Sequence, residues 1–116
     1  MSSIGDLIRV HTETIILACL MKGDNYGYEI NKSIFQRTGG VFELKEATLY
    51  TVFRKLEKGD YIQSYWGDEQ KGARRRYYKI TSKGIHQYEF QIVKWQEAKV
   101  MIDQLILLME EDKIHE

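Results

Sequence analysis

The sequence has no proline, a single cysteine and no long uncharged apolar run among its 116 residues. One cysteine cannot form a disulfide within the chain, and Cys19 lies in the apolar run 15–21, where a buried structural side chain is expected. Asp6, Arg9 and Glu13 interrupt the N-terminal segment, so we expect neither a secretory signal nor a membrane span. These absences indicate a small cytoplasmic protein without a membrane partner.

Residue groups typical of catalytic and metal sites are also absent. The three histidines, His11, His86 and His115, lie far apart, and none has a cysteine or carboxylate at a recurring ligand spacing. The sequence has no glycine-rich phosphate loop, no glycine-flanked nucleophilic serine and no carboxylate pair in an apolar segment. We therefore expect no enzyme activity, no metal ion and no cofactor.

Net charge is zero, but the charges are unevenly distributed along the chain. Residues 45–83 hold ten lysines and arginines against five aspartates and glutamates. Residues 84–116 hold three basic side chains against seven acidic ones. The middle of the chain can therefore face a polyanion such as the DNA backbone, whereas the C-terminal segment cannot.

The spacing of apolar residues predicts a mainly α chain. One helix is expected over residues 4–21, before Gly23, and a second is expected to start after a cap at Asp24 or Asn25 and to end at the glycine pair 39–40. The inner face of the second helix would hold Tyr26, Ile30 and Ile34. These segments predict two short helices joined by a tight turn.

A third helix is predicted from Glu46 to Lys58, with Gly59 closing it. Its inner positions would be Leu49, Val52, Phe53 and Leu56. The period then changes from 3.6 to 2, which predicts a hairpin with strands in 61–66 and 75–80 around a polar turn. From Ser82 the helical period resumes for about thirty residues with a heptad seam. We expect a mainly α fold with a small β-hairpin.

The outward face of the third helix is polar and basic. It carries Thr48, Thr51, Lys55 and Lys58, with Tyr50 and Arg54 on its flank. Such side chains suit reading of the major groove, although a solvated amphipathic helix is the more common explanation of such a face. The hairpin favours DNA, because five positive charges fall within nine residues at Lys71, Arg74, Arg75, Arg76 and Lys79. Like charges across a strand pair are unfavourable unless a polyanion accepts them.

Three stretches of the chain resemble the signature segments of PadR-type transcriptional regulators: 23–30 (GDNYGYEI), 47–59 (ATLYTVFRKLEKG) and 72–81 (GARRRYYKIT). The short length and the sequence SYWGDE at 64–69 also resemble the compact subgroup of LmrR-type multidrug-sensing repressors. The resemblance implies a winged helix-turn-helix domain over residues 1–81 and a dimerisation helix over 82–116. Together with the face of the third helix, it identifies these residues as DNA-binding: Lys45, Thr48, Tyr50, Thr51, Arg54, Lys55, Lys71, Arg74 and Arg75.

The resemblance further implies a homodimer, in which the first and last helices pack against a second copy and present two recognition helices to a pseudo-palindromic operator in double-stranded DNA. The heptad seam fits this arrangement independently. The expected dimer contacts are Ile85, Tyr88, Ile92, Trp95, Ile102, Leu105, Ile106 and Met109.

Trp95 is the most informative residue of the seam. From the residues alone, packing in the dimer core is its more common role. In the LmrR-type subgroup, a tryptophan at the matching position lines a central pore where two rings sandwich planar ligands, so the resemblance implies a small aromatic or hydrophobic effector. Its expected contacts are Leu7, Ile8, His11, Ile15, Ile92, Trp95 and Lys99. Lys99 stands where a cation site would offer a carboxylate, so we expect non-cationic ligands, although Asp103 and Glu13 could supply negative charge.

Two other functions fit the same residues. A winged helix can dock an acidic protein partner through its basic face, and this alternative predicts weak, sequence-indifferent DNA affinity. A ligand-binding carrier dimer would use Trp95 but not the basic hairpin. Specific binding to an operator distinguishes the regulator from both alternatives.

Overall fold

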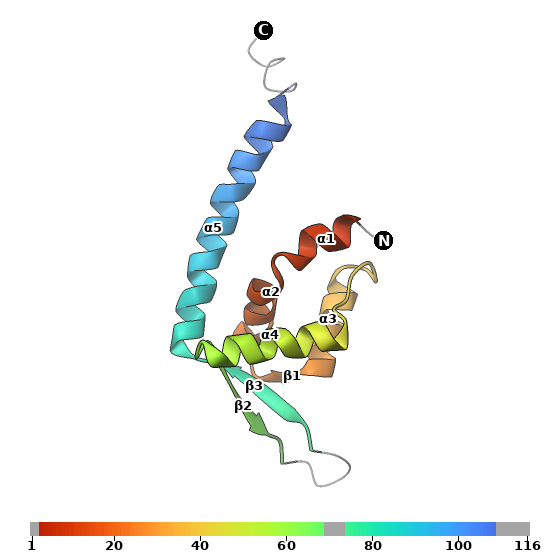
Figure 1. The fold of residues 1–116 in the computed structure, drawn as a ribbon, viewed down its shortest axis with the longest axis vertical. Helices are drawn as coiled ribbons and strands as arrows, with labels where there is room; N and C mark the ends of the chain where they lie inside the picture. The colour runs from red at the N-terminus through yellow and green to blue at the C-terminus, as the bar shows by residue number, and fades with distance from the viewer. Residues whose placement is uncertain (1–2, 69–73, 109–116) are drawn as a thin grey trace.

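The computed structural model describes residues 3–68 and 74–108, and Figure 1 shows their arrangement. In chain order the helices and strands are α1 (Ser3–Arg9), α2 (Thr12–Met21), β1 (Asn25–Tyr26), α3 (Gly27–Arg37), α4 (Glu46–Lys58), β2 (Ile62–Trp66), β3 (Arg76–Ile80) and α5 (Ser82–Ile106). The strands form an antiparallel sheet in the order β1, β3, β2. The predicted fold class, a mainly helical winged helix-turn-helix with a long C-terminal helix, is confirmed.

The core lies between α2, α3, α4 and the inner face of the hairpin that β2 and β3 form. The inward positions of α4 at Leu49, Phe53 and Leu56 are buried as the helical spacing predicts, and Val52 is half-buried against them. The Phe53 ring stacks on Tyr78 of β3, with 3.9 Å between the ring centroids. Because its apolar side faces this core, α4 turns its polar side outward next to the hairpin.

The prediction of one helix over residues 4–21 is wrong, because a turn at residues 10–11 divides it into α1 and α2. At this turn the Thr12 hydroxyl donates a hydrogen bond to the carbonyl of Arg9 at 2.6 Å. A threonine side chain bonded to the backbone in this way competes with continued helix. Thr12 is buried, so α2 is anchored in the core while α1 follows a different direction (Figure 1).

The segment before α3 also differs from the prediction. Asn25 and Tyr26 form β1, which pairs with β3, so the sheet has three strands where a two-stranded hairpin was expected. Neither predicted cap binds the start of α3. Asp24 accepts a hydrogen bond from the Tyr65 hydroxyl at 2.6 Å, and the side chain of Asn25 accepts one from the Tyr26 amide at 2.9 Å. These bonds tie the start of α3 to the sheet.

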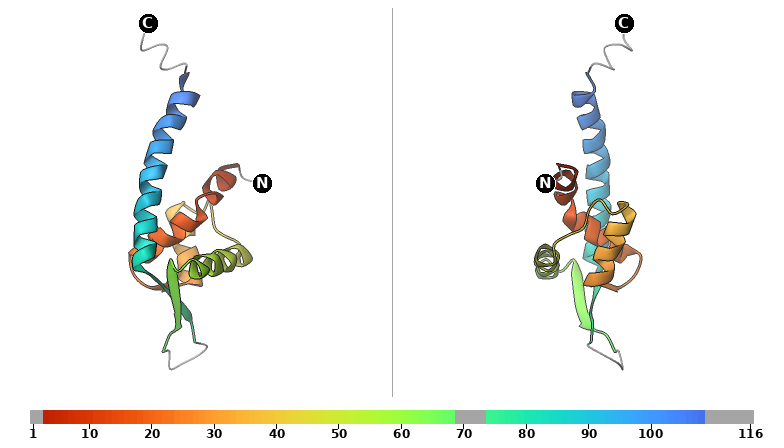
Figure 2. Two further views of the ribbon diagram at one scale, coloured as in Figure 1. Left: turned by 60° about the vertical axis from the view of Figure 1, so that its left-hand side comes forward. Right: turned by 90° about the vertical axis from the view of Figure 1, so that its right-hand side faces the viewer.

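The base of α5 is fixed to the rest of the molecule by a closely packed first turn. The Thr81 side chain accepts a hydrogen bond from the Gly84 amide at 3.0 Å and donates one to the Asp60 carbonyl at 2.6 Å. Gly84 is buried, and a Cβ atom there would lie 2.1 Å from the Tyr61 carbonyl oxygen. Beyond its base α5 contacts α2 and then extends away from the other helices (Figure 1 and Figure 2). Among the described helices, none combines the length and the hydropathy that crossing a membrane requires.

Candidate nucleic-acid interface

The outward face of α4 presents an arginine supported by a threonine. The Thr51 hydroxyl donates a hydrogen bond to the Ala47 carbonyl at 2.8 Å, as hydroxyls in helices often do. The same oxygen accepts a bond from Nη2 of Arg54 at 3.2 Å. Lys45, at the start of the helix, is exposed. A guanidinium held on a helix surface is suited to bidentate contact with phosphate or guanine.

Two other predicted side chains on α4 are partly used by the fold. The Tyr50 ring meets Phe53 edge-on at 5.7 Å between centroids, and 37% of Tyr50 stays accessible. A Cβ atom on Gly27, at the start of α3, would lie 3.0 Å from the Tyr50 hydroxyl. Thr48 is half-buried. The structure therefore leaves both Tyr50 and Thr48 only partly accessible to a binding partner.

Lys55 forms an ion pair that the sequence did not predict. Its Nζ lies 3.0 Å from Oε2 of Glu13 on α2, and both side chains are substantially exposed. An exposed pair of this kind contributes about 0–1 kcal/mol, so a phosphate can displace the carboxylate. Lys55 therefore reaches the surface with its charge partly neutralised.

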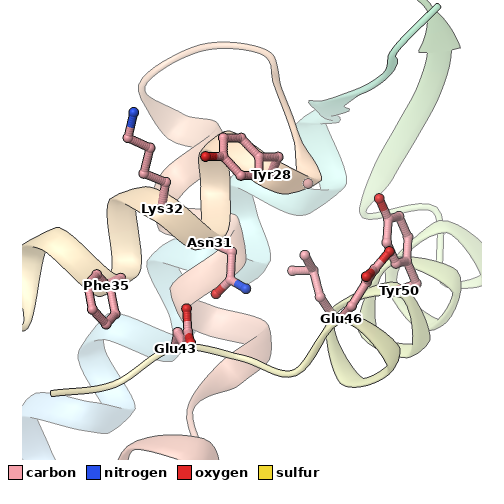
Figure 3. Close-up of a pocket in the computed structure, with 9 residues that line it drawn as sticks. Tyr28, Asn31, Lys32, Phe35, Glu43, Glu46 and Tyr50 are labelled. Atoms are coloured by element: carbon pink, nitrogen blue, oxygen red, sulfur yellow. The ribbon is translucent and has the colours of Figure 1, made fainter. Parts of the chain in front are cut away.

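A shallow hollow of about 370 Å³ lies between α3 and the first turn of α4, and Figure 3 shows the side chains that line it. The side chain of Asn31 holds one wall in place, because it donates to the Leu44 carbonyl at 2.7 Å and accepts from the Leu44 amide at 2.9 Å. The remaining lining includes Tyr28, Lys32, Phe35, Glu43, Glu46 and Tyr50. Apart from Tyr50, none of these side chains was predicted from the sequence to belong to a site. Their mixture of charges and rings extends the polar surface of α4 toward α3.

The hairpin carries three consecutive arginines with different contacts. Nε of Arg74 donates to the Gly67 carbonyl at 3.2 Å, and its guanidinium lies 5.9 Å from the Trp66 ring centroid. The guanidinium of Arg75 lies over the Tyr26 ring at 4.9 Å. Arg76 turns instead toward α4: its Nη2 donates to the hydroxyl of Ser64 on β2 at 2.7 Å and lies 3.5 Å from Oε2 of Glu57 on α4. The predicted contact Lys71 lies outside the described residues.

The hairpin and α4 lie next to each other at the end of the molecule farthest from the free end of α5 (Figure 1 and Figure 2). The side chain of Glu57 on α4 contacts both strands, through Ser64 of β2 and Arg76 of β3. Two elements that carry basic side chains, a helix and a hairpin, are thus joined side by side. This arrangement can place a helix in one groove and a hairpin over the adjacent backbone.

The residues expected to bind an effector are only partly brought together. The ring of His11 meets Trp95 edge-on, with 4.8 Å between centroids and 70° between planes, and 44% of Trp95 is accessible. Ile8 and Ile15 pack against the core of the chain, and Leu7 is exposed. The remaining candidates on α5 are the half-buried Ile92 and the exposed Lys99.

The residues expected to form a dimer follow the length of α5. Near its base Ile85 is half-buried and Tyr88 packs against the core of the same chain. Farther along, Ile102, Leu105 and Ile106 are exposed by 47%, 71% and 72%. The predicted contact Met109 lies outside the described residues. The second half of α5 therefore carries apolar side chains that the described part of this chain does not cover.

Cys19 and Tyr65 are among the described side chains whose pKa values are shifted for an identifiable physical reason. Burial raises the pKa of the Cys19 thiol, which outweighs the lowering by Arg37 and Lys22. The hydrogen bond that the Tyr65 hydroxyl donates to Asp24 raises the pKa of Tyr65. Neither group stands among the predicted DNA contacts, so both shifts report on the fold.

A family model described as the transcriptional regulator PadR-like family matches residues 16–89. The chain belongs to this family. Among solved structures, a transcriptional regulator from Clostridium thermocellum is 46% identical in sequence, and the match covers 87% of this chain and 98% of that chain with a TM-score of 0.80. A PadR family transcription regulator from Clostridium difficile is 35% identical over 83% of this chain and 98% of that chain, with a TM-score of 0.75.

A more distant relative is the PadR protein of Bacillus subtilis, whose structure is in complex with operator DNA. It is 21% identical, covers 71% of this chain and 46% of that chain, and has a TM-score of 0.64. At this level of identity the likeness shows a shared PadR fold. The winged helix described above is therefore the family's architecture.

In this PadR-family chain, the side chains at the candidate interface that were not predicted from the sequence are partners of predicted basic residues. Glu13 pairs with Lys55, and Glu57 with Ser64 binds Arg76. These pairs join residues 42 and 19 positions apart, and no periodicity of one helix or strand relates them. The pair of rings at His11 and Trp95 was expected as part of one site, and the structure places them in contact.

Proposed function

We propose that this PadR-family chain binds a pseudo-palindromic operator as a homodimer and represses transcription in the cytoplasm. The observation that carries the proposal is that α4, with Arg54 bonded to the hydroxyl of Thr51, is joined through Glu57 to the hairpin that carries Arg74 and Arg75. The operator complex of the Bacillus subtilis relative, which has the same fold, supports it. Residues 1–81 then serve as the DNA-binding domain and 82–116 as the dimerisation helix.

A mobility-shift titration tests the proposal. The purified protein is mixed with the DNA upstream of its own gene, at two salt concentrations and with excess unrelated competitor DNA. We expect binding that survives the competitor and falls steeply with salt, because several phosphates are neutralised. Weak binding that does not depend on sequence would instead favour docking of an acidic protein partner on the same basic surface.

The dimer is proposed to form through α5. Two exposed apolar side chains, Leu105 and Ile106, follow the exposed Ile102 by three and four positions, as apolar residues do in helices that pair along a seam. Exposed apolar surface of this length on a helix is typical of an interface. A second copy of the chain covers the seam symmetrically and places two copies of α4 on one side of the assembly.

A second function, ligand sensing of the LmrR type, is favoured by the surroundings of Trp95. The ring is accessible over 44% of its area and its edge is supported by His11 at 4.8 Å. A planar molecule can stack on such a supported ring at the dimer interface. Lys99 lies one helical turn further, so we propose neutral or anionic aromatic effectors in preference to cations.

Fluorescence quenching tests the sensor. We expect planar aromatic compounds to quench the tryptophan emission of the wild-type protein and to lower its affinity for the operator. Trp95→Ala is expected to abolish this response, while the emission of Trp66, on the hairpin, provides the internal reference. Undiminished ligand binding by Trp95→Ala contradicts the proposed site.

A further inference from the structure

A network of three side chains joins the end of α4 to both long strands of the hairpin. Nη2 of Arg76 on β3 donates to Oγ of Ser64 on β2 at 2.7 Å, and the Ser64 hydroxyl donates to Oε2 of Glu57 on α4 at 2.8 Å. Nη2 of Arg76 also lies 3.5 Å from the same carboxylate oxygen. We call this set the α4–hairpin network.

The network lies on the hairpin face that is turned toward α4. Arg76 is directly opposite Trp66 in the strand register, and its guanidinium lies 5.8 Å from the ring centroid of that tryptophan. Tyr65 and Tyr77 stack on each other with 5.7 Å between centroids, and their side chains alternate to the other face. The guanidinium of Arg76 is therefore held by a ring, a hydroxyl and a carboxylate of its own chain, although 45% of its side chain stays exposed.

The hairpin needs such a connection, because a ribbon of two strands has little stability by itself. Within the described residues, the third strand β1 contributes two residues, paired with Tyr77 and Tyr78. The ends of β2 and β3 at Trp66 and Arg76 lie beyond that pairing. Hydrogen bonds with ionised partners are stronger than neutral ones, so the network is suited to fix the angle between the hairpin and α4.

We infer that Arg76 is a positioning residue, which together with Ser64 and Glu57 sets the hairpin against α4 for DNA binding and does not itself contact phosphate. The inference rests on the proposed DNA-binding function. It separates Arg76 from its neighbours Arg74 and Arg75, although the three are adjacent in the sequence. Glu57, a carboxylate close to the proposed DNA surface, then supports DNA binding despite its charge.

Two substitutions separate positioning from simple electrostatics. Ser64→Ala changes no charge, and Glu57→Ala removes a negative charge that repels the DNA backbone. If charge alone mattered, the first would leave operator affinity unchanged and the second would raise it. Positioning predicts that both weaken binding by about three- to tenfold, the range for the net contribution of one ordinary hydrogen bond. Glu46→Ala is the matched control, because it removes a carboxylate from the same helix that has no ion pair among the described residues.

A double-mutant cycle completes the experiment. Arg76→Ala and Glu57→Ala are each measured in the full-length protein by fluorescence anisotropy with a labelled operator, at several salt concentrations and well below the melting temperature of each variant. We expect similar losses from each single variant, and a double variant no weaker than either, because the network acts as a unit. Arg74→Ala provides the contrast, with a loss that is independent of Glu57 and a salt slope reduced by about one.

The inference is overturned if Glu57→Ala binds the operator more tightly than wild type and the loss from Arg76→Ala persists unchanged in the double variant. Arg76 would then be a direct phosphate contact. Wild-type protein without specific operator binding in the same titrations would mean that the proposed function has failed. In one experiment, the variants thus test the inference and the wild-type protein tests the proposed function.

Discussion

Arg54 stands exposed on α4, and its guanidinium is held by the Thr51 hydroxyl at 3.2 Å. We expect Arg54→Ala to weaken operator binding by about 1–3 kcal/mol, because it removes a contact to a base or phosphate. The dimer should remain intact, since Arg54 lies on α4 and not on the proposed seam of α5. Lys94→Ala is the control, because that lysine lies on α5 and pairs with Glu97 at 3.8 Å. Equal affinity of Arg54→Ala and wild type in anisotropy titrations contradicts the assignment of α4 as the recognition helix.

Cys19 shows how burial changes the reactivity of a single side chain. Because burial raises the pKa of its thiol, less thiolate is present near neutral pH than in an exposed cysteine. We expect slow reaction with a disulfide reagent at pH 7, faster reaction as the pH rises toward the shifted pKa, and rapid reaction once the protein is unfolded in guanidinium. A native-state rate equal to the unfolded rate at pH 7 would show that the thiol is open to solvent. The sequence predicted a buried structural cysteine, and the structure places it half-buried against the core.

Side-chain partners were the least predictable feature at this scale. Position on an element followed from spacing, so Thr51, Arg54 and Lys55 were correctly placed on the outward side of α4. Their contacts did not follow, because Glu13 reaches Lys55 only after α2 and α4 have packed together. Contacts between distant parts of the chain depend on tertiary geometry, which a periodic pattern does not contain.

Among the elements, α5 depends most on one small residue. In Gly84→Ala, the added methyl group would lie 2.1 Å from the Tyr61 carbonyl oxygen and 2.7 Å from the Ile80 side chain. Alanine favours helix by about 1 kcal/mol over glycine, but such a clash with backbone costs roughly 1–3 kcal/mol or more. We expect a melting temperature lower by several degrees in thermal denaturation followed by circular dichroism. His86→Ala, at an exposed position two residues further along α5, is the control and should change the melting temperature little. A Gly84→Ala protein as stable as this control contradicts the close packing.

Elements with strong local signals were predicted at their observed bounds. The i, i+3, i+4 spacing and the closing glycine located α4 at Glu46–Lys58, and the return of helical period located the start of α5 at Ser82. The break between α1 and α2 depends on one hydroxyl bonded to a carbonyl, and β1 exists because β3 lies beside it. Neither feature changes the hydrophobic period, so the sequence predicted one helix and no third strand.

For the whole molecule, the decisive property is whether two copies associate through α5. Leu105→Glu places a charge at a side chain that is 71% exposed in this chain and is proposed to be buried in the dimer. We expect sedimentation to change from dimer to monomer, with loss of operator binding at the same protein concentration. Gln104→Glu adds the same charge on a neighbouring position outside the proposed seam and should remain dimeric. A dimer that survives Leu105→Glu contradicts the seam.

The fixed base of α5 has a geometric consequence for such a dimer. A helix of 25 residues is about 37 Å long, so a change of roughly 5° in its tilt at Gly84 displaces the far end by about 3 Å, close to the rise of one base pair. In the proposed dimer, the close packing at Gly84 that holds this tilt would therefore also hold the separation of the operator half-sites that the two subunits can span together.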